Sequence, residues 1–137
     1  MGESSQLHVR MEKLVQSLQL LAGTFELQVS SLPKFVHVPD EVALTYDEVY
    51  VFVDELASAR LLGVAERGDL QRLDAVLADM SQNKSLWTMH ALRTAHQWED
   101  VRRLASDVLR SLGREKERPD LFWVQYVRGK RASTPGK

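Results

Sequence analysis

The fold class depends on residues 38–62, VPDEVALTYDEVYVFVDELASARLL. The centre of this stretch, residues 49–53, consists of β-branched and aromatic residues that favour a β-strand. On both sides of the centre, apolar residues recur with the 3.6-residue period of a helix. The flanks therefore predict one continuous helix over about residues 40–62, capped by Asp40 and stopped by Gly63. A strand over residues 49–53 is the alternative.

The rest of the chain also follows a helical period. Thr24, Asp69 and Thr88 are residues of the type that caps a helix N-terminus. Besides 40–62, we expect helices over about residues 5–22, 24–31, 69–80, 89–92 and 98–112. Residues 121–127 do not fit this pattern and are predicted to form a short strand or an extended segment. The sequence thus predicts an all-α fold, a compact bundle of about five to six helices, with Trp87 and Trp98 at least partly buried.

The length of 137 residues suits one domain with a single core. We predict one domain over residues 1–128, made of a helical core (5–113) and a packed aromatic segment (119–128), followed by a disordered basic tail (129–137). No apolar run approaches the ~20 residues of a membrane span. The apolar stretch near the N-terminus is interrupted by Lys13 and Gln16, unlike a signal peptide. With no cysteine in the chain, we expect a cytoplasmic protein without disulfides.

Motifs for catalysis are not found in the sequence. The four histidines, His8, His37, His90 and His96, are scattered, and none has the spacing of a zinc-binding motif. The seven glycines form neither a phosphate-binding loop nor a dinucleotide fingerprint. We therefore expect no metal site, no cofactor and no enzymatic activity.

Charge is strongly segregated along the chain. Residues 40–80 contain ten acids and three bases, a net charge of −7, whereas residues 114–137 contain seven bases and three acids, a net charge of +4. On the predicted helix, pairs of acids seven residues apart form a stripe opposite the core face, and two apolar residues lie within it. The candidate partner-binding residues are Asp40, Glu41, Leu44, Asp47, Glu48, Val51, Asp54 and Glu55.

An acidic rim around an apolar centre is suited to docking a basic protein. The alternative is that the acids form a solvated surface, while Leu44 and Val51 pack against a neighbouring helix.

The C-terminal segment suggests another binding function. Phe122, Trp123 and Tyr126 are flanked by Arg and Lys residues, a combination that suits single-stranded nucleic acid. Against this, the sequence pI is about 6.4, well below that of typical nucleic-acid binders. In the competing interpretation, Leu121, Trp123 and Val127 fold back onto the helical core.

The sequence also resembles a known group of proteins over about residues 7–113. The similar positions are 38–44, 46–48, 73–81, 86–88, 91–92 and 98–102, which include Trp87, Trp98 and several acidic and capping residues. In these positions the chain resembles small all-helical bacterial immunity proteins of polymorphic toxin systems, including those of contact-dependent growth inhibition. The resemblance implies a cytoplasmic protein that binds the C-terminal domain of a toxin, often a nuclease that cuts tRNA.

Charge and resemblance together favour one hypothesis. The protein is expected to neutralise a cognate toxin by forming a stoichiometric complex through its acidic helix face, without binding nucleic acid or a membrane itself. The first alternative is a helical adaptor or regulatory protein for another basic protein. The second is a binder of single-stranded nucleic acid through the C-terminal segment. The sequence does not indicate the oligomeric state.

Overall fold

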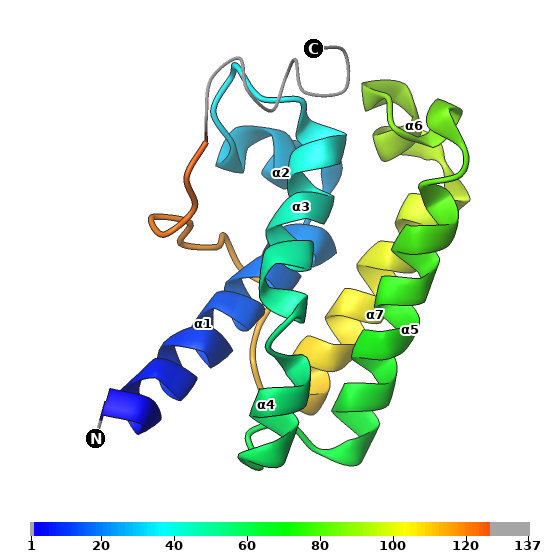
Figure 1. The fold of residues 1–137 in the computed structure, drawn as a ribbon. Coiled ribbons are helices and arrows are strands. Elements are labelled where there is room, and N and C mark those ends of the chain that lie inside the picture. The colour runs from blue at the N-terminus through cyan, green and yellow to red at the C-terminus, as the bar shows by residue number, and fades with distance from the viewer. Residues whose placement is uncertain (1, 127–137) are drawn as a thin grey trace.

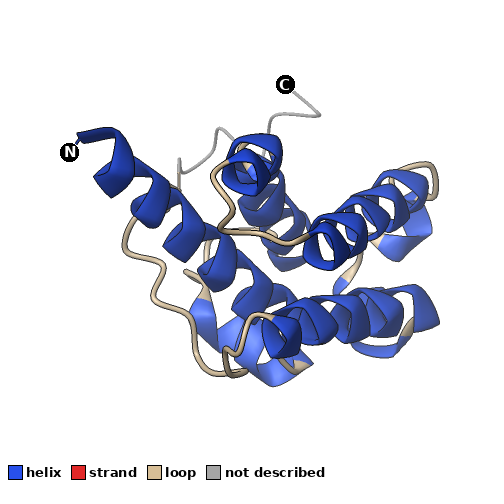
Figure 2. Ribbon diagram, turned by 90° about the horizontal axis from the view of Figure 1, so that it is seen from below, coloured by secondary structure: helices blue, strands red, loops and turns tan. Residues whose placement is uncertain are grey.

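The computed structural model describes residues 2–126, with side chains from residue 5 onward. Within this range the protein is all-α, as predicted, and Figures 1 and 2 show helices joined by short loops. The elements are α1 (Gly2–Ala22), α2 (Phe25–Ser31), α3 (Val38–Tyr50), α4 (Val53–Ser58), α5 (Val64–Met80), a 3-10 turn (Lys84–Leu86), α6 (Met89–Thr94) and α7 (His96–Ser111). No helix among the described residues is long and apolar enough to cross a membrane.

The long central helix predicted over residues 40–62 is divided in two. Residues 49–53 do not form a strand, but the helix is interrupted by a turn at Val51 and Phe52, where the Phe52 N–H donates to the Val49 carbonyl. The aromatic ring of Phe52 lies 4.3 Å from the Arg10 guanidinium of α1, a cation–π contact. The interruption of the helix thus coincides with a contact between residues distant in the sequence. Because the predicted central helix is two helices, residues 2–126 contain seven α-helices instead of five to six.

Two of the predicted helix starts are also wrong. Helix α3 begins at Val38 after His37, so Asp40 lies in its first turn and does not cap it. Helix α5 begins at Val64 after Gly63, so Gly68 and Asp69 lie inside the helix. An acidic side chain in the first turn is favourable because of the helix dipole, which explains why Asp40 suits this place without capping.

The predicted threonine caps are confirmed. Thr24 Oγ1 accepts a hydrogen bond from the Leu27 N–H at the start of α2, and Thr88 Oγ1 accepts one from the Ala91 N–H at the start of α6. Each bond satisfies a backbone donor that a helix start leaves without an intrahelical partner. These two starts could be predicted because the cap is a local interaction.

Trp98 and Trp87 join α7 to the loop after α5. Trp98 is fully buried and donates its indole N–H to the Leu86 carbonyl at 2.7 Å, while the half-buried Trp87 donates to the Met80 carbonyl at 2.9 Å. The two rings meet edge to face, with centroids 5.3 Å apart. The prediction that both indoles are at least partly buried is confirmed.

Arg102 of α7 ties three other elements together. Its guanidinium donates to the Gly23 carbonyl (3.1 Å), to Gln28 Oε1 (2.9 Å) and to the Leu92 carbonyl (2.7 Å). Gln28 is fully buried and donates to the Leu20 and Leu21 carbonyls at the end of α1. The two Gln28 bonds supply donors to carbonyls at the end of α1, where the intrahelical pattern stops, and the Leu20 carbonyl also accepts from the Gly23 N–H at 3.3 Å.

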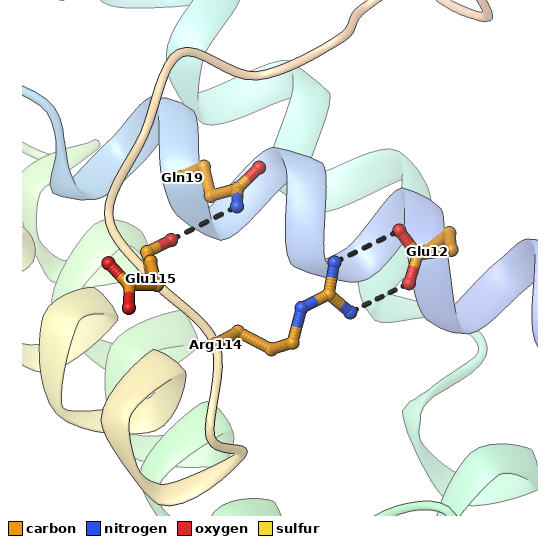
Figure 3. Close-up of polar contacts among 4 residues, drawn as sticks. All are labelled: Glu12, Gln19, Arg114 and Glu115. Atoms are coloured by element: carbon orange, nitrogen blue, oxygen red, sulfur yellow. Dashed lines mark hydrogen bonds and ion pairs between the residues drawn. The ribbon is translucent and has the colours of Figure 1, made fainter.

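The C-terminal segment, residues 114–126, packs along α1 without forming a strand (Figure 1). Figure 3 shows its first attachments: Arg114 pairs with both carboxylate oxygens of Glu12, at 2.7 and 3.2 Å, and Gln19 donates to the Glu115 carbonyl at 3.1 Å. Farther along, the Asp120 N–H donates to Gln16 Oε1. Within the stretch predicted to be a strand or an extended segment, residues 122–123 instead form a turn, in which the Val124 N–H donates to the Leu121 carbonyl at 3.0 Å.

The apolar and aromatic side chains of the C-terminal segment differ in how far they are exposed to solvent. Leu121, Trp123 and Tyr126 are half-buried against the core, with Lys13 5.6 Å above the Trp123 ring, whereas Phe122 is 86% exposed. The prediction that Leu121 and Trp123 fold back onto the core is confirmed. Val127 and the predicted tail at 129–137 lie outside the described residues.

The first prediction concerns Arg102. Arg102→Met removes three hydrogen bonds and leaves buried acceptors without a donor, so we expect it to lower the free energy of unfolding by about 2–4 kcal/mol. The adjacent Arg103 is exposed and pairs only with Asp100 one turn away, so Arg103→Met should change it by less than about 0.5 kcal/mol. Urea denaturation measures both variants, and equal effects would contradict the assigned role.

The second prediction compares neighbours in the C-terminal segment. Trp123→Ala removes a half-buried indole from the surface of α1 and should cost about 2 kcal/mol in unfolding free energy. Phe122→Ala removes a ring that touches little of the protein and should stay within about 0.5 kcal/mol of wild type. Thermal and urea unfolding of the two variants provide the comparison. A Trp123→Ala protein as stable as Phe122→Ala would mean that the segment does not contribute to the core.

Candidate partner-binding site

One face of helix α3 packs in the hydrophobic core, and the opposite face points toward solvent. Val42, Tyr46 and Val49 are buried and pack in the hydrophobic core. Tyr46 also donates its hydroxyl hydrogen to the Leu70 carbonyl of α5 at 2.9 Å, and burial raises the pKa of this phenol far above its ordinary value. Because these contacts fix the rotation of α3 about its axis, they determine which residues face outward.

We call the outward surface of this helix the α3 outer face. Its members come from the predicted acidic stripe and are Asp40, Leu44, Asp47, Glu48 and Val51. Val51 is 72% exposed and Leu44 is 37% exposed, while Asp47 and Glu48 are exposed and Asp40 is half-buried. The alternative placed both Leu44 and Val51 against a neighbouring helix within a solvated acidic surface. The exposure of Val51 contradicts it for that residue, whereas the exposed acids also fit a solvated surface. The sequence correctly placed apolar side chains among the outward acids.

Glu41 does not belong to this surface, contrary to prediction. Its residue is 1% exposed, and one turn later Thr45 is fully buried and donates its hydroxyl hydrogen to the Glu41 carbonyl at 2.8 Å. Glu41 thus lies on the inward side of the helix, beyond the edge of the α3 outer face. A side chain with so little exposed area offers no charge to a partner at the surface.

Asp54 and Glu55 are exposed but do not extend the stripe either. They belong to α4, which the turn at residues 51–52 separates from α3. Asp54 pairs with Arg67 of α5 at 2.6 Å, and Glu55 pairs with Arg10 of α1 at 2.6 Å. The two carboxylates therefore engage helices on different sides, and each has its charge compensated by an arginine. The continuous stripe predicted over three acid pairs ends near Val51.

Asp74 of α5 adds an acid that the stripe did not include. Burial, and then the negative charge of Asp47, raise the pKa of the Asp74 carboxyl above its ordinary value. The same carboxyl contributes, after burial, to the raised pKa of the Tyr50 hydroxyl. Asp74 is half-buried, and its carboxyl is close enough to that of Asp47 for the two charges to interact. Its place could have been found from the sequence only with the correct start of α5 and the packing of α5 on α3.

Some acids of the protein pair with arginines, and others do not. Among residues 5–126, Glu12, Asp54, Glu55, Asp69, Asp100 and Asp107 each form an ion pair with an arginine. Asp40, Asp47 and Asp74 form no such pair with a described residue. Several other acids form no arginine pair with a described residue either: Glu26, Glu66, Asp79, Glu99, Glu115, Glu117 and Asp120. What sets the α3 region apart is that Asp47 and Asp74 interact with each other and that the apolar Leu44 and Val51 are exposed on the same helix as Asp47, a combination that suits a cationic partner.

The other candidate chemistries find little support in the geometry. In the part of the chain with described side chains, no three His, Asp or Glu residues lie close enough together to hold a metal ion. In the C-terminal segment, Arg114 pairs with Glu12, and Arg118 donates to Ser30 and Ser31. The rings of Trp123 and Tyr126 pack on the core, so among the three aromatic residues only Phe122 is largely exposed for stacking.

Comparison of the chain with protein families, with curated proteins and with solved structures finds no match in any of the three.

The third prediction tests the repulsion between Asp47 and Asp74. A carboxyl whose pKa is raised in the folded state destabilises that state as the pH rises through the raised pKa, because ionisation then favours unfolding. Asp74→Asn should therefore raise the melting temperature at pH 7 and have little effect near pH 3, where the carboxyl is largely protonated.

The double variant provides the control. Asp47→Asn should also raise the melting temperature at pH 7, and the double variant should gain less than the sum of the single changes, since each change removes the same repulsion. Calorimetry of the four proteins at both pH values completes the cycle. Additive gains would show that the two carboxylates do not interact.

Proposed function

We propose that the protein is an immunity protein that neutralises a cognate toxin domain, a nuclease acting on tRNA, by forming a stoichiometric complex. The observation that carries the proposal is the α3 outer face, where acidic side chains surround the exposed apolar side chains of Leu44 and Val51. The sequence resemblance to small helical immunity proteins supports the same assignment. In this proposal the protein acts in the cytoplasm by binding alone, without catalysis.

The chemistry of a nuclease explains why such a face would suit it. A nuclease binds the phosphate backbone of its substrate with Lys and Arg side chains. A surface of carboxylates is attracted to those side chains, which raises the rate of encounter and directs the inhibitor to the substrate-binding region. Exposed Leu44 and Val51 then provide apolar area that is removed from water in the complex. Two routes to inhibition follow: covering the active site, or binding beside it and excluding tRNA by bulk.

A second candidate function uses the same face. A helical adaptor or regulator would dock another basic protein on Asp40, Asp47 and Asp74, and the geometry suits that partner equally. The two functions differ in the identity of the partner. A toxin C-terminal domain encoded immediately upstream of this gene, which forms a complex with the protein and loses its nuclease activity, would distinguish the immunity protein from the adaptor.

The fourth prediction tests the face against that toxin domain. Val51→Asp places a charge in the apolar centre and should cost about 2 kcal/mol, or about thirtyfold in affinity, mainly through faster dissociation. Asp47→Lys combined with Glu48→Lys should slow association and reduce its dependence on salt, since these charges act on encounter. Stopped-flow and surface plasmon resonance measure both rate constants.

Matched controls separate binding from folding. Val64, at the start of α5, is 91% exposed and lies outside the α3 outer face, so Val64→Asp makes the same chemical change elsewhere on the surface. Val51→Asp and Val64→Asp should keep the wild-type melting temperature within a few degrees, because the altered side chains contribute little to the core. The protein with Asp47→Lys and Glu48→Lys should melt no lower than wild type, since it lacks the repulsion between Asp47 and Asp74. Wild-type rate constants in both α3 variants would refute the use of this face by the toxin.

A further inference from the structure

Four residues of the α3 outer face have the spacing of a coiled-coil seam. Asp40, Leu44, Asp47 and Val51 are separated by four, three and four residues. The first three lie in α3, and Val51 directly follows its last residue with helical backbone angles (φ −60°, ψ −18°), so the four side chains continue one row. We call this row the α3 seam. It alternates acidic and apolar side chains over eleven residues after Asp40, or about 16 Å at 1.5 Å per residue.

We infer that the partner segment lying on the α3 seam is an amphipathic α-helix of about three turns, with Lys or Arg and apolar residues alternating at the same four-three spacing. The inference rests on the proposed function and specifies the chemistry of the partner. It does not depend on whether the partner is a nuclease.

Backbone hydrogen bonding is the first reason for a helix. A partner segment that covers the seam loses water from its own backbone N–H and C=O groups, which must then be satisfied. An extended segment does this by pairing with the edge of a sheet, but residues 2–126 contain no strand to pair with. The backbone of α3 is already bonded within its helix. A helical partner segment satisfies its backbone internally, so it needs only side-chain contacts from α3.

Spacing is the second reason. Neighbouring side chains of the seam are three or four residues apart, or about 5 Å along the axis, and a second helix repeats at the same rise. Side chains on one face of a strand repeat about every 6.7 Å. An extended segment in register with Asp40 would therefore be out of register by about 4 Å at Val51. A helix can meet all four side chains, whereas a strand can meet two.

Charge identifies the side chains of that helix. Two seam residues are acids, Glu48 is exposed on one side of the row, and Asp74 lies near Asp47 on the α5 side. A facing helix therefore gains most from cations opposite the acids and apolar side chains opposite Leu44 and Val51. Parallel pairing of the seam with a second copy of this chain would set Asp against Asp, and antiparallel pairing would set each Asp against Leu44 or Val51, so a second copy offers no cation to either acid. The occupant is accordingly a basic helix of another protein.

The test uses three synthetic peptides and the full chain. The first is a fourteen-residue peptide with Leu and Lys at four-three spacing, held helical by a lactam bridge on its outer face. The second has the same residues shuffled so that Leu and Lys alternate every second position, and the third has the original order with a central proline that prevents a helix. Fluorescence anisotropy at low salt gives the three affinities.

Variants locate the binding site on the protein. Affinity for the bridged peptide should fall about tenfold or more in Asp47→Lys and in Val51→Asp. It should stay within about twofold of wild type in Glu117→Lys and Val64→Asp, which make the same changes at exposed positions outside the seam. Circular dichroism of each variant verifies that it is folded.

The expected result is that the bridged peptide binds about tenfold or more tightly than the shuffled and proline peptides, because only it presents a preformed, matching row. Three results would overturn the inference. The three peptides could bind with equal affinity, the bridged peptide could bind the seam variants as tightly as wild type, or no peptide could show saturable binding at millimolar concentration. If the three peptides bind equally but toxin binding still depends on Asp47 and Val51, the inference of a helical partner is wrong and the proposed function stands. Toxin binding indifferent to these residues would overturn the proposed function.

Discussion

The C-terminal half of α1 must be covered on every side, and the rest of the bundle is arranged to meet this constraint. Nearly all residues from Leu14 to Ala22 are buried, including the polar Ser17 and Gln19. Helices α3 and α7 make the largest sets of contacts with α1, and residues 114–126 cover a further part of it. A helix that is apolar on nearly all sides is stable in water only when it is enclosed in this way. The inward face of α3 is thus assigned to α1, and the acidic side is left outside.

How far the sequence could predict this fold depends on the range of the interactions. The end of α1 near Gly23 and the starts of α2 and α6 depend on adjacent residues, and they were predicted correctly. The turn at residues 51–52 was missed because the helical period continues through it, while Arg10 contacts Phe52 from forty-two positions away in the sequence. The start of α5 was misplaced because Gly68 looks like a helix boundary but lies within the helix.

The candidate site could also be predicted only in part, because some of its residues depend on contacts between helices that are distant in the sequence. Leu44, Asp47 and Val51 were placed correctly, since their outward direction follows from the helical period within α3. Asp54 and Glu55 fell outside the surface because the axis changes at the turn and because Arg67 and Arg10 come from other helices. Glu41 lies near the boundary between the two sides of α3, where a period alone cannot distinguish burial from exposure. Asp74 required knowledge of how α5 packs on α3.

In the proposed complex, Asp47 and Asp74 affect both the stability of the protein and its binding of a cationic partner. Burial, and then the negative charge of Asp47, disfavour the ionised carboxylate of Asp74 in the folded state, and a cation beside the two acids would oppose this effect. A partner that brings a cation between the two acids binds the folded state only, and so it stabilises that state. Burial of the half-covered Asp74 strengthens the effect, because water screens its charge less than that of an exposed acid. In the complex proposed here, the same two carboxylates that disfavour the isolated folded state contribute to the binding of a basic helix.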